Sequence, residues 1–478
     1  MKTEKRNYYL KKFVLLPLVV LSTLIIWLIP TSALGIDGLT VLQQRTLAIF
    51  FFAALMWMFE LIPAWATSVS TIVLLLLAVS NKGFVTALAE GGWAEGAAVS
   101  HRDLMAAFAD PIIMLFLGGF VLAFAANKVG LDTYLAKTLL HLFGSKPRNV
   151  LLGFLLIIGF FSMFMSNTAT AAMMLAFLAP VLKTLPENGG GRISLAMSIP
   201  IAANIGGIGT PIGTPPNAIA LGQLSQLGIN IGFGSWMMHM VPFVVVMLLF
   251  AWVLLMLLFP FKAKTIEIHI EDTKKHDADF WIVSVTFAAT ILLWVTSEWT
   301  GLDSNVVALI PFAVFAITGV FKHDDFAKID WHVLWMVAGG FALGTALNKT
   351  GLATTLIASI PFASWSALAV MIAAGLIIYL LSTFISNSSA ANLLMPILAV
   401  VGTAMGENIA SLGGIGSMLC YVALAASLAM TLPISTPPNA IACSTGLIKT
   451  RDMIKVGLIL GAVGMVLGFA IVMLFPFK

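Results

Sequence analysis

The two stretches that decide the fold are nearly identical: residues 212–220 read IGTPPNAIA, and residues 434–442 read ISTPPNAIA. Consecutive prolines remove backbone donors and clash with preceding carbonyls, so neither stretch can continue a regular α-helix. The glycines of the segment 206–216 weaken the first helix further. Because each stretch interrupts a long uncharged segment, we predict two broken helices, with a first break at 206–216 and a second break at 432–438.

Two further blocks repeat in the same order, at an offset of about 221 residues. Gly118-Gly119-Phe120 returns as Gly339-Gly340-Phe341, and Ser166-Asn167-Thr168 returns as Ser386-Asn387-Ser388. Three blocks in one order at nearly constant spacing indicate an internal repeat rather than independent turns.

The composition around the breaks is that of a membrane protein. Of the 478 residues, 60% are hydrophobic and 10% are charged, and the mean hydropathy is +1.02. A soluble domain carries about 25% charged residues, so a water-exposed globular surface is excluded. With 2 cysteines in the chain, a disulfide scaffold and a cysteine-rich metal site are excluded as well. We predict an all-α polytopic membrane protein.

Long apolar stretches recur from end to end and predict about eleven transmembrane helices. The first follows a cluster of cations. We interpret it as a retained helix rather than a secretory signal peptide, because no clear small-residue cleavage site follows it. The predicted crossings are 13–29, 46–62, 64–80, 111–136, 193–222, 234–261, 279–297, 304–321, 332–356, 411–446 and 453–476.

Two further uncharged segments are predicted to be re-entrant hairpins. As one helix, residues 149–182 would be about 51 Å long at 1.5 Å per residue, too long for a hydrocarbon core of about 30 Å. Cations flank both ends, and because cations collect on the cytoplasmic side, both ends are expected inside. The tip then falls near 166–168, where polar residues interrupt the apolar run. The repeat partner is the hairpin 361–406, with its tip at 386–388.

The distribution of cations predicts the topology. With the hairpins not counted as crossings, the N-terminus is cytoplasmic and the C-terminus lies outside. All but five of the 25 Lys and Arg residues then fall on the cytoplasmic side. Lys128 falls inside while its repeat counterpart Lys349 falls outside, so the repeats are inverted, an arrangement typical of secondary transporters. The five outside are Arg45, Lys82, Arg102, Lys349 and Lys478.

The repeated motifs can bind a cation and an anion together. A broken helix leaves free carbonyls and hydroxyls that suit Na⁺, and free N–H groups that suit an anion. The charge of an anion must be offset by half-helix dipoles, hydrogen bonds and co-bound cations, which favours Na⁺ coupling. Glu60 and His239 are the nearest candidates for a proton relay. Glu60 is interpreted as an interfacial or capping carboxylate, and His239 as a core or interface histidine. No Lys, Arg, Asp or Glu occurs in 149–182, 193–261, 363–406 or 409–447.

At these residues the chain resembles the divalent anion:Na⁺ symporter family, over roughly residues 40–478. The twin Ser-Asn-Thr-type tips and twin Thr-Pro-Pro-Asn breaks carry the resemblance. It implies inverted repeats, a scaffold domain that forms a homodimer, and a mobile transport domain that moves like an elevator. Threonine is usual where this chain has Ser388, which leaves the preferred substrate size open.

The resemblance also implies the site residues. It assigns the substrate carboxylates to Asn167, Thr168, Asn387 and Ser388, bordered by Thr214 and Thr436. It assigns one Na⁺ site to Ser162, Ser166, Asn167 and the backbone near Gly213, and the other to Ser382, Asn387 and the backbone near Ser435 and Pro437. In each hairpin the two serines are one helical turn apart, so both can face one ion.

We expect a Na⁺-coupled symporter of C4-dicarboxylates such as succinate, malate and fumarate, and not an enzyme. The alternatives are a Na⁺-independent dicarboxylate exchanger on the same fold and, from other classes, a channel or an intramembrane enzyme. Short loops favour a bacterial inner membrane, with the lipid bilayer and no nucleic acid as partner. The expected organisation is a tail and first helix at 1–45, a first repeat at 46–262, a cytoplasmic linker at 263–278 and a second repeat at 279–478.

Overall fold

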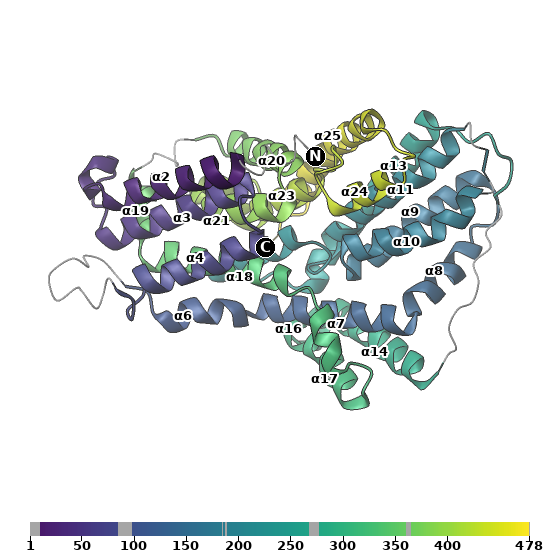
Figure 1. Cartoon of the computed structure of the whole chain (residues 1–478), viewed down its shortest axis with the longest axis horizontal. Helices are drawn as coiled ribbons and strands as arrows, with labels where there is room; N and C mark the ends of the chain where they lie inside the picture. The colour runs from purple at the N-terminus through teal and green to yellow at the C-terminus, as the bar shows by residue number, and fades with distance from the viewer. Residues whose placement is uncertain are drawn as a thin grey trace.

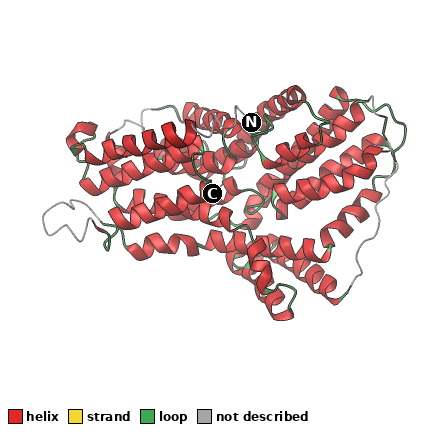
Figure 2. Ribbon diagram, viewed as in Figure 1, coloured by secondary structure: helices red, strands yellow, loops and turns green. Residues whose placement is uncertain are grey.

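The computed structural model describes residues 10–84, 98–183, 185–186, 189–266, 277–359 and 365–477. This part of the chain is built almost entirely of helices (Figures 1 and 2), and its β-pairing is limited to a single bridge between Ser80 and Val99. Apolar side chains from most helices form one continuous buried core. Large apolar side chains also stay exposed on outer helix faces, as expected of helices that lie in lipid.

The helices fall into two halves of the chain. The first half holds α2 (Leu16–Leu28), α3 (Val41–Phe59), α4 (Ala64–Ala78), α6 (His101–Ala106), α7 (Pro111–Val129), α8 (Leu131–His141), α9 (Pro147–Phe164), α10 (Asn167–Lys183), α11 (Gly190–Gly206), α12 (Pro215–Gln226) and α13 (Phe233–Leu258). The second half holds α14 (Ala278–Val295), α15 (Ser297–Thr300), α16 (Ser304–Val307), α17 (Leu309–Thr318), α18 (Trp331–Lys349), α19 (Leu352–Ser359), α20 (Ala367–Phe384), α21 (Asn387–Met405), α22 (Glu407–Ala410), α23 (Gly414–Ser427), α24 (Pro437–Ser444) and α25 (Thr450–Leu474). Short π or 3₁₀ turns are η1 (Leu10–Leu15), η2 (Thr31–Leu34), η4 (Ala107–Ala109), η5 (Gly207–Gly209) and η6 (His323–Lys328).

Among the described residues, 8 helical spans are long and apolar enough to cross a bilayer. Five shorter apolar helices accompany them. The prediction of an all-helical, multi-pass membrane protein is therefore confirmed. The long spans include α9, α20 and α21 of the predicted hairpins, so helix length alone does not give the number of crossings, and the count of about eleven stays a prediction.

Two predicted crossings end earlier than hydropathy indicated. The stretch 111–136 stops at Gly130, which has φ 77°, and the stretch 332–356 stops just before Gly351, which has φ 75°. Glycine adopts this left-handed conformation without strain and commonly ends a helix. The separate helices α8 and α19 follow. Because few charged residues follow each glycine within the predicted crossing, hydropathy could not detect the bend.

The two predicted hairpins are pairs of helices in contact, each pair joined by two residues. Met165–Ser166 joins α9 to α10, and Ile385–Ser386 joins α20 to α21. In both, the serine hydroxyl accepts a hydrogen bond of 3.2 Å from the N–H three residues further on. The polar tips therefore begin new helices by capping them.

The hairpins pack across the repeat. Helix α10 of the first hairpin contacts α24, which follows the second break, and α21 of the second hairpin contacts α12, which follows the first break. Each hairpin thus lies against the half-helix of the other repeat. This exchange brings both tips and both breaks to one cavity.

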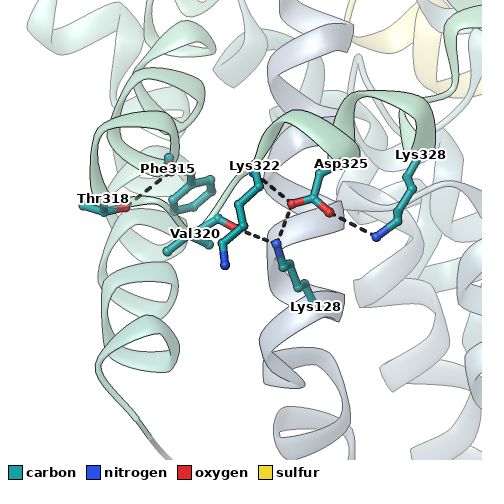
Figure 3. Close-up of polar contacts among 7 residues, drawn as sticks. All are labelled: Lys128, Phe315, Thr318, Val320, Lys322, Asp325 and Lys328. Atoms are coloured by element: carbon teal, nitrogen blue, oxygen red, sulfur yellow. Dashed lines mark hydrogen bonds and ion pairs between the residues drawn. The ribbon is translucent and has the colours of Figure 1, made fainter.

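Two ion pairs also join the repeats. Lys128, in the last turn of α7, donates to Asp325 at 2.5 Å, as Figure 3 shows. Its repeat counterpart Lys349, in the last turn of α18, donates to Asp103 at 2.5 Å. Asp325 lies in the segment before α18 and Asp103 lies in the segment before α7, so the two pairs match each other under the repeat. The Asp325 side chain is only 4% exposed, whereas that of Asp103 is 39% exposed.

The buried pair has a further partner. Asp325 also accepts from Lys328 at 3.0 Å and from the Lys322 backbone N–H at 2.9 Å (Figure 3). Burial alone would raise the pKa of the Asp325 carboxyl, but the hydrogen bonds from Lys128, Lys322 and Lys328 outweigh burial and hold the pKa below its ordinary range. Because the folded pKa is lowered, this stabilisation is present at neutral pH and is lost as pH falls below about 4.

Lys128→Met is expected to lower the free energy of unfolding by about 2 kcal/mol, because it removes one cationic partner of the buried Asp325 carboxylate. The other partner, Lys328, remains. The matched change Lys349→Met breaks an exposed pair and should cost less than about 1 kcal/mol. Thermal unfolding of the two purified variants measures the difference at pH 7. Equal losses would show that burial does not distinguish the two pairs.

Candidate functional site

One cavity of about 1180 Å³ lies where the tips and breaks meet. Both hairpin tips and both breaks contribute to its lining, together with parts of α7, α10 and the start of α18. The predicted site residues that line it are Ser166, Asn167, Thr168, Gly213, Thr214, Asn387, Ser388, Ser435, Thr436 and Pro437. The other two, Ser162 and Ser382, are fully buried one helical turn before the tips. The repeat therefore brings the predicted substrate residues of both halves into one space.

In the first half, three oxygen atoms converge on the amide of Asn167. The end of this amide lies 2.7 Å from Ser162 Oγ, 3.0 Å from the Ala203 carbonyl oxygen and 3.2 Å from the Gly213 carbonyl oxygen. With its NH₂ turned inward, Asn167 donates to these oxygens. With its own oxygen turned inward, Asn167 Oδ1 and the Ala203 carbonyl each lie 2.7 Å from Ser162 Oγ, which has one hydrogen to donate. The oxygens that receive no hydrogen repel one another, and a cation among them would offset that repulsion. The same residues can thus form a hydrogen-bonded state and a cation-filled state.

Close backbone approach at the first break explains two of its glycines. A Cβ on Gly207 would lie 2.5 Å from Asn167 Oδ1, and a Cβ on Gly213 would lie 2.4 Å from the Gly207 carbonyl oxygen. Asn217 holds the same backbone, because its Nδ2 donates to the carbonyls of Gly207 at 3.1 Å and Thr210 at 2.8 Å. The break therefore presents its carbonyl oxygens in a fixed arrangement.

The second half contains buried oxygens that the described residues leave without a hydrogen-bond partner: Ser382 Oγ and Asn387 Oδ1. The Ser435 hydroxyl donates to the Thr383 carbonyl at 2.7 Å. An ion would therefore be bound by the Ser435 backbone rather than by its side chain. A buried oxygen without a partner is unfavourable. A cation bound to Ser382 and Asn387 would remove that cost.

The cavity also includes residues that the motifs did not predict. Lys328 lines it from η6, and its ammonium pairs with Asp325. Asn204 lines it from α11, three residues before η5 begins. The repeated Gly-Gly-Phe blocks lie in α7 and α18, and no repeated block marks the loop between α17 and α18. Asn204 gave no signal, because its position in the second repeat holds an alanine. The remaining unpredicted lining includes Phe116, Phe120, Phe124, Asp330 and His332.

Glu60, interpreted as an interfacial or capping carboxylate, lies at the end of α3 and also contacts the second tip. It ends α3 with φ 46°, the one positive φ of a non-glycine residue in the described ranges. Its carboxylate also accepts from the Ser386 N–H at 3.3 Å, so α3 touches the second tip. His239 lies 4.3 Å from the Phe477 ring, centroid to centroid, and its Nδ1 is 2.7 Å from the Ser235 carbonyl. These contacts agree with the interpretation of His239 as a packed, satisfied histidine.

A helical, multi-pass fold with duplicated hairpins and broken helices around one cavity is typical of secondary transporters. Residues 10–476 match the family model described as the sodium:sulfate symporter transmembrane region. The chain belongs to this family, that of the divalent anion:Na⁺ symporters, and is a membrane transporter rather than an enzyme.

Named relatives cover most of the chain. It is 30% identical to the sodium-dependent dicarboxylate transporter SdcS of Staphylococcus saprophyticus over 458 residues, 88% of this chain and 84% of the relative. It is also 30% identical to SdcS of Staphylococcus aureus strain USA300 over 448 residues, 86% of this chain and 82% of the relative. The crystal structure of the Alcanivorax borkumensis YdaH transporter is similar with a TM-score of 0.58 at 15% identity, covering 86% of this chain and 98% of that one. This last similarity concerns the fold alone.

Proposed function

We propose that the chain is a Na⁺-coupled symporter of C4-dicarboxylates such as succinate, malate and fumarate. Two relatives at 30% identity are named sodium-dependent dicarboxylate transporters. The observation that carries the proposal is the convergence, at the first tip, of Ser162 Oγ, the Asn167 amide, the Gly213 carbonyl of the break and the Ala203 carbonyl of α11. Hydroxyl, amide and carbonyl oxygens beside a broken helix are the ligands with which transporters bind Na⁺.

In this proposal each tip binds one Na⁺ and shares the substrate with the other tip. The first Na⁺ is bound by Ser162, Ser166, Asn167 and Gly213, and the second by Ser382, Asn387, Ser435 and Pro437. The substrate lies between the tips, on Asn167, Thr168, Asn387 and Ser388, with Thr214 and Thr436 beside it. Half-helices α10, α12, α21 and α24 begin at the same cavity, and their N-terminal dipoles favour an anion there.

The cavity supports an inward-facing state in an elevator mechanism. From the tips it extends to Asn127, near the end of α7, and to Lys328, on the side whose cations are predicted to be cytoplasmic. We propose that the hairpins and broken helices move together as the transport domain and carry Na⁺ and substrate past a scaffold. We propose further that this scaffold forms a homodimer in a bacterial inner membrane.

The second candidate function is a Na⁺-independent exchanger, and a single uptake experiment distinguishes it from a symporter. Purified protein in empty liposomes is offered labelled succinate, malate, fumarate, citrate or sulfate, with either Na⁺ or choline outside. Symport predicts uptake of the C4-dicarboxylates that requires Na⁺ and no internal dicarboxylate. Uptake that ignores Na⁺ and requires internal dicarboxylate would establish exchange instead, and the panel identifies the substrate in either case.

The proposed inverted topology is tested by cysteine labelling in a cysteine-free variant. Cysteines placed at Lys146 and Pro186, which flank the first hairpin, should label only from the cytoplasm. Cysteines at Asn348 and Glu407, which flank the second, should label only from outside. All four positions are exposed, so a membrane-impermeant maleimide can reach each from its own side. Labelling of Lys146→Cys and Pro186→Cys from opposite faces would replace the first hairpin with a single crossing.

A further inference from the structure

We propose that Asn204 is a positioning residue, which turns the hydroxyl of Thr436 toward the bound anion. Asn204 lies in α11 of the first repeat, and Thr436 caps α24 in the second repeat. The pair therefore links the two halves of the site. This inference rests on the proposed function and adds a residue that belongs to neither repeated motif.

The orientation of the Asn204 amide is fixed by Asn439. Asn439 Nδ2 donates to the carbonyls of Met430 at 2.9 Å and Leu432 at 2.8 Å, so its Oδ1 is left as an acceptor. Asn204 Nδ2 donates to that Oδ1 at 3.1 Å. Asn204 is 1% exposed, and the reversed amide would place two oxygens against each other without water, which is unfavourable. The NH₂ of Asn204 therefore faces the second break.

The same NH₂ determines what the Thr436 hydroxyl can do. Thr436 Oγ1 accepts from Asn204 Nδ2 at 3.0 Å and from the Asn439 backbone N–H at 3.3 Å. A hydroxyl has two acceptor lone pairs and one hydrogen, so both acceptor positions are occupied. Within the part of the chain that the structure describes, Thr436 Oγ1 donates to no protein oxygen. Because Thr436 lines the cavity, its hydrogen is left to donate to the ligand.

A donor fixed in this way favours an anionic ligand. Hydrogen bonds to a carboxylate are stronger than those between neutral groups. A hydroxyl that is already oriented also loses no rotational freedom when the anion binds. The breaks carry no Lys or Arg, so a fixed hydroxyl donor is one of the few groups that can offset the charge of a dicarboxylate there.

The first half-site lacks this arrangement and supplies the matched control. The position of Asn204 corresponds to Ala426 in the second repeat. Asn217, the counterpart of Asn439, has a buried Oδ1 that no described residue contacts by a hydrogen bond. Thr214, the counterpart of Thr436, makes no capping hydrogen bond to α12 with its side chain. Asn204 should therefore act on Thr436 and not on Thr214.

A double-mutant cycle on succinate uptake tests the proposal. Asn204→Ala and Thr436→Val should each raise KM by about tenfold or more, with a smaller change in kcat, since each removes one oriented bond to the charged ligand. In the Thr436→Val background, Asn204→Ala should have no further effect on KM. In the Thr214→Val background it should raise KM as much as in the wild type.

Three results would overturn the proposal: independent, multiplicative effects of Asn204→Ala and Thr436→Val, equal coupling to Thr214, or wild-type KM in Asn204→Ala. Asn204→Leu keeps a similar side-chain size but has no hydrogen-bond donor, so it serves as a second variant if Asn204→Ala fails to fold, and the same KM increase is expected. If the wild-type protein transports another anion of the uptake panel and no dicarboxylate, the proposed substrate is wrong, but the proposed role of Asn204 is not yet contradicted. The cycle would then be run with that anion, so the two failures are distinguishable.

Discussion

Asn167→Ala and Asn387→Ala are each expected to lower Na⁺-dependent succinate uptake by at least about 100-fold while the protein stays folded. Each asparagine is proposed to contact an ion and a substrate carboxylate together. Loss of a hydrogen bond to a charged group costs about 1.5–3 kcal/mol, or roughly ten- to hundredfold in affinity, and here an ion ligand is lost as well. The Asn167 amide lies within 3.2 Å of three oxygens. Alanine would remove the group that contacts all three.

Asn149→Ala, in the first turn of α9, and the exposed Asn408→Ala supply matched controls, because neither residue lines the cavity. Both should keep uptake close to that of the wild type. Initial rates in proteoliposomes, with size-exclusion profiles to confirm folding, measure the comparison. Near-normal uptake by either Asn167→Ala or Asn387→Ala would remove the corresponding tip from the proposed site.

Succinate affinity is expected to fall by about 100-fold when Na⁺ is replaced by choline. The two carboxylates of the substrate carry two full charges, and a half-helix N-terminus offsets only about half a charge. Lys328 is the one Lys or Arg among the described residues that line the cavity, and its ammonium already pairs with Asp325 at 3.0 Å. Bound Na⁺ beside each tip would supply the missing positive charge. A coupling of this size corresponds to roughly 3 kcal/mol.

Equilibrium binding of succinate to purified protein, in Na⁺, K⁺ and choline at one ionic strength, measures this coupling. Potassium controls for general screening and should behave as choline does. Because none of the residues proposed to bind Na⁺ or the substrate is titratable, pH should act mainly through the second ionisation of the substrate. Equally tight succinate binding in all three salts would contradict Na⁺ coupling and favour the exchanger.

The breaks and tips could be predicted from sequence because their chemistry is local. Paired prolines forbid a continuous helix wherever they occur, and the structure interrupts both helices there. The capping serines at 166 and 386 likewise begin new helices, because each hydroxyl accepts a hydrogen bond from the N–H three residues further on. The internal repeat indicated that the two tips and the two breaks belong together, and the structure places them in one cavity.

What the sequence could not predict depends on contacts between distant residues. Gly130 and Gly351 end helices within long hydrophobic stretches, where hydropathy does not report a change of chain direction. Asn204 matters through Thr436 and Asn439, more than 230 positions away, and no repeated motif marks it. Lys328 enters the cavity because a buried carboxylate holds its loop. Each of these became visible only when the packing of the two repeats was known.

The most direct test of Na⁺-coupled symport is whether a Na⁺ gradient alone moves succinate against its own gradient. Proteoliposomes are loaded with unlabelled succinate and diluted into buffer that contains the same concentration of labelled succinate and excess Na⁺. Symport predicts net accumulation of succinate inside, which collapses when a Na⁺ ionophore is added and does not occur with choline. Exchange of label without net accumulation, at the same rate in Na⁺ and in choline, would contradict it.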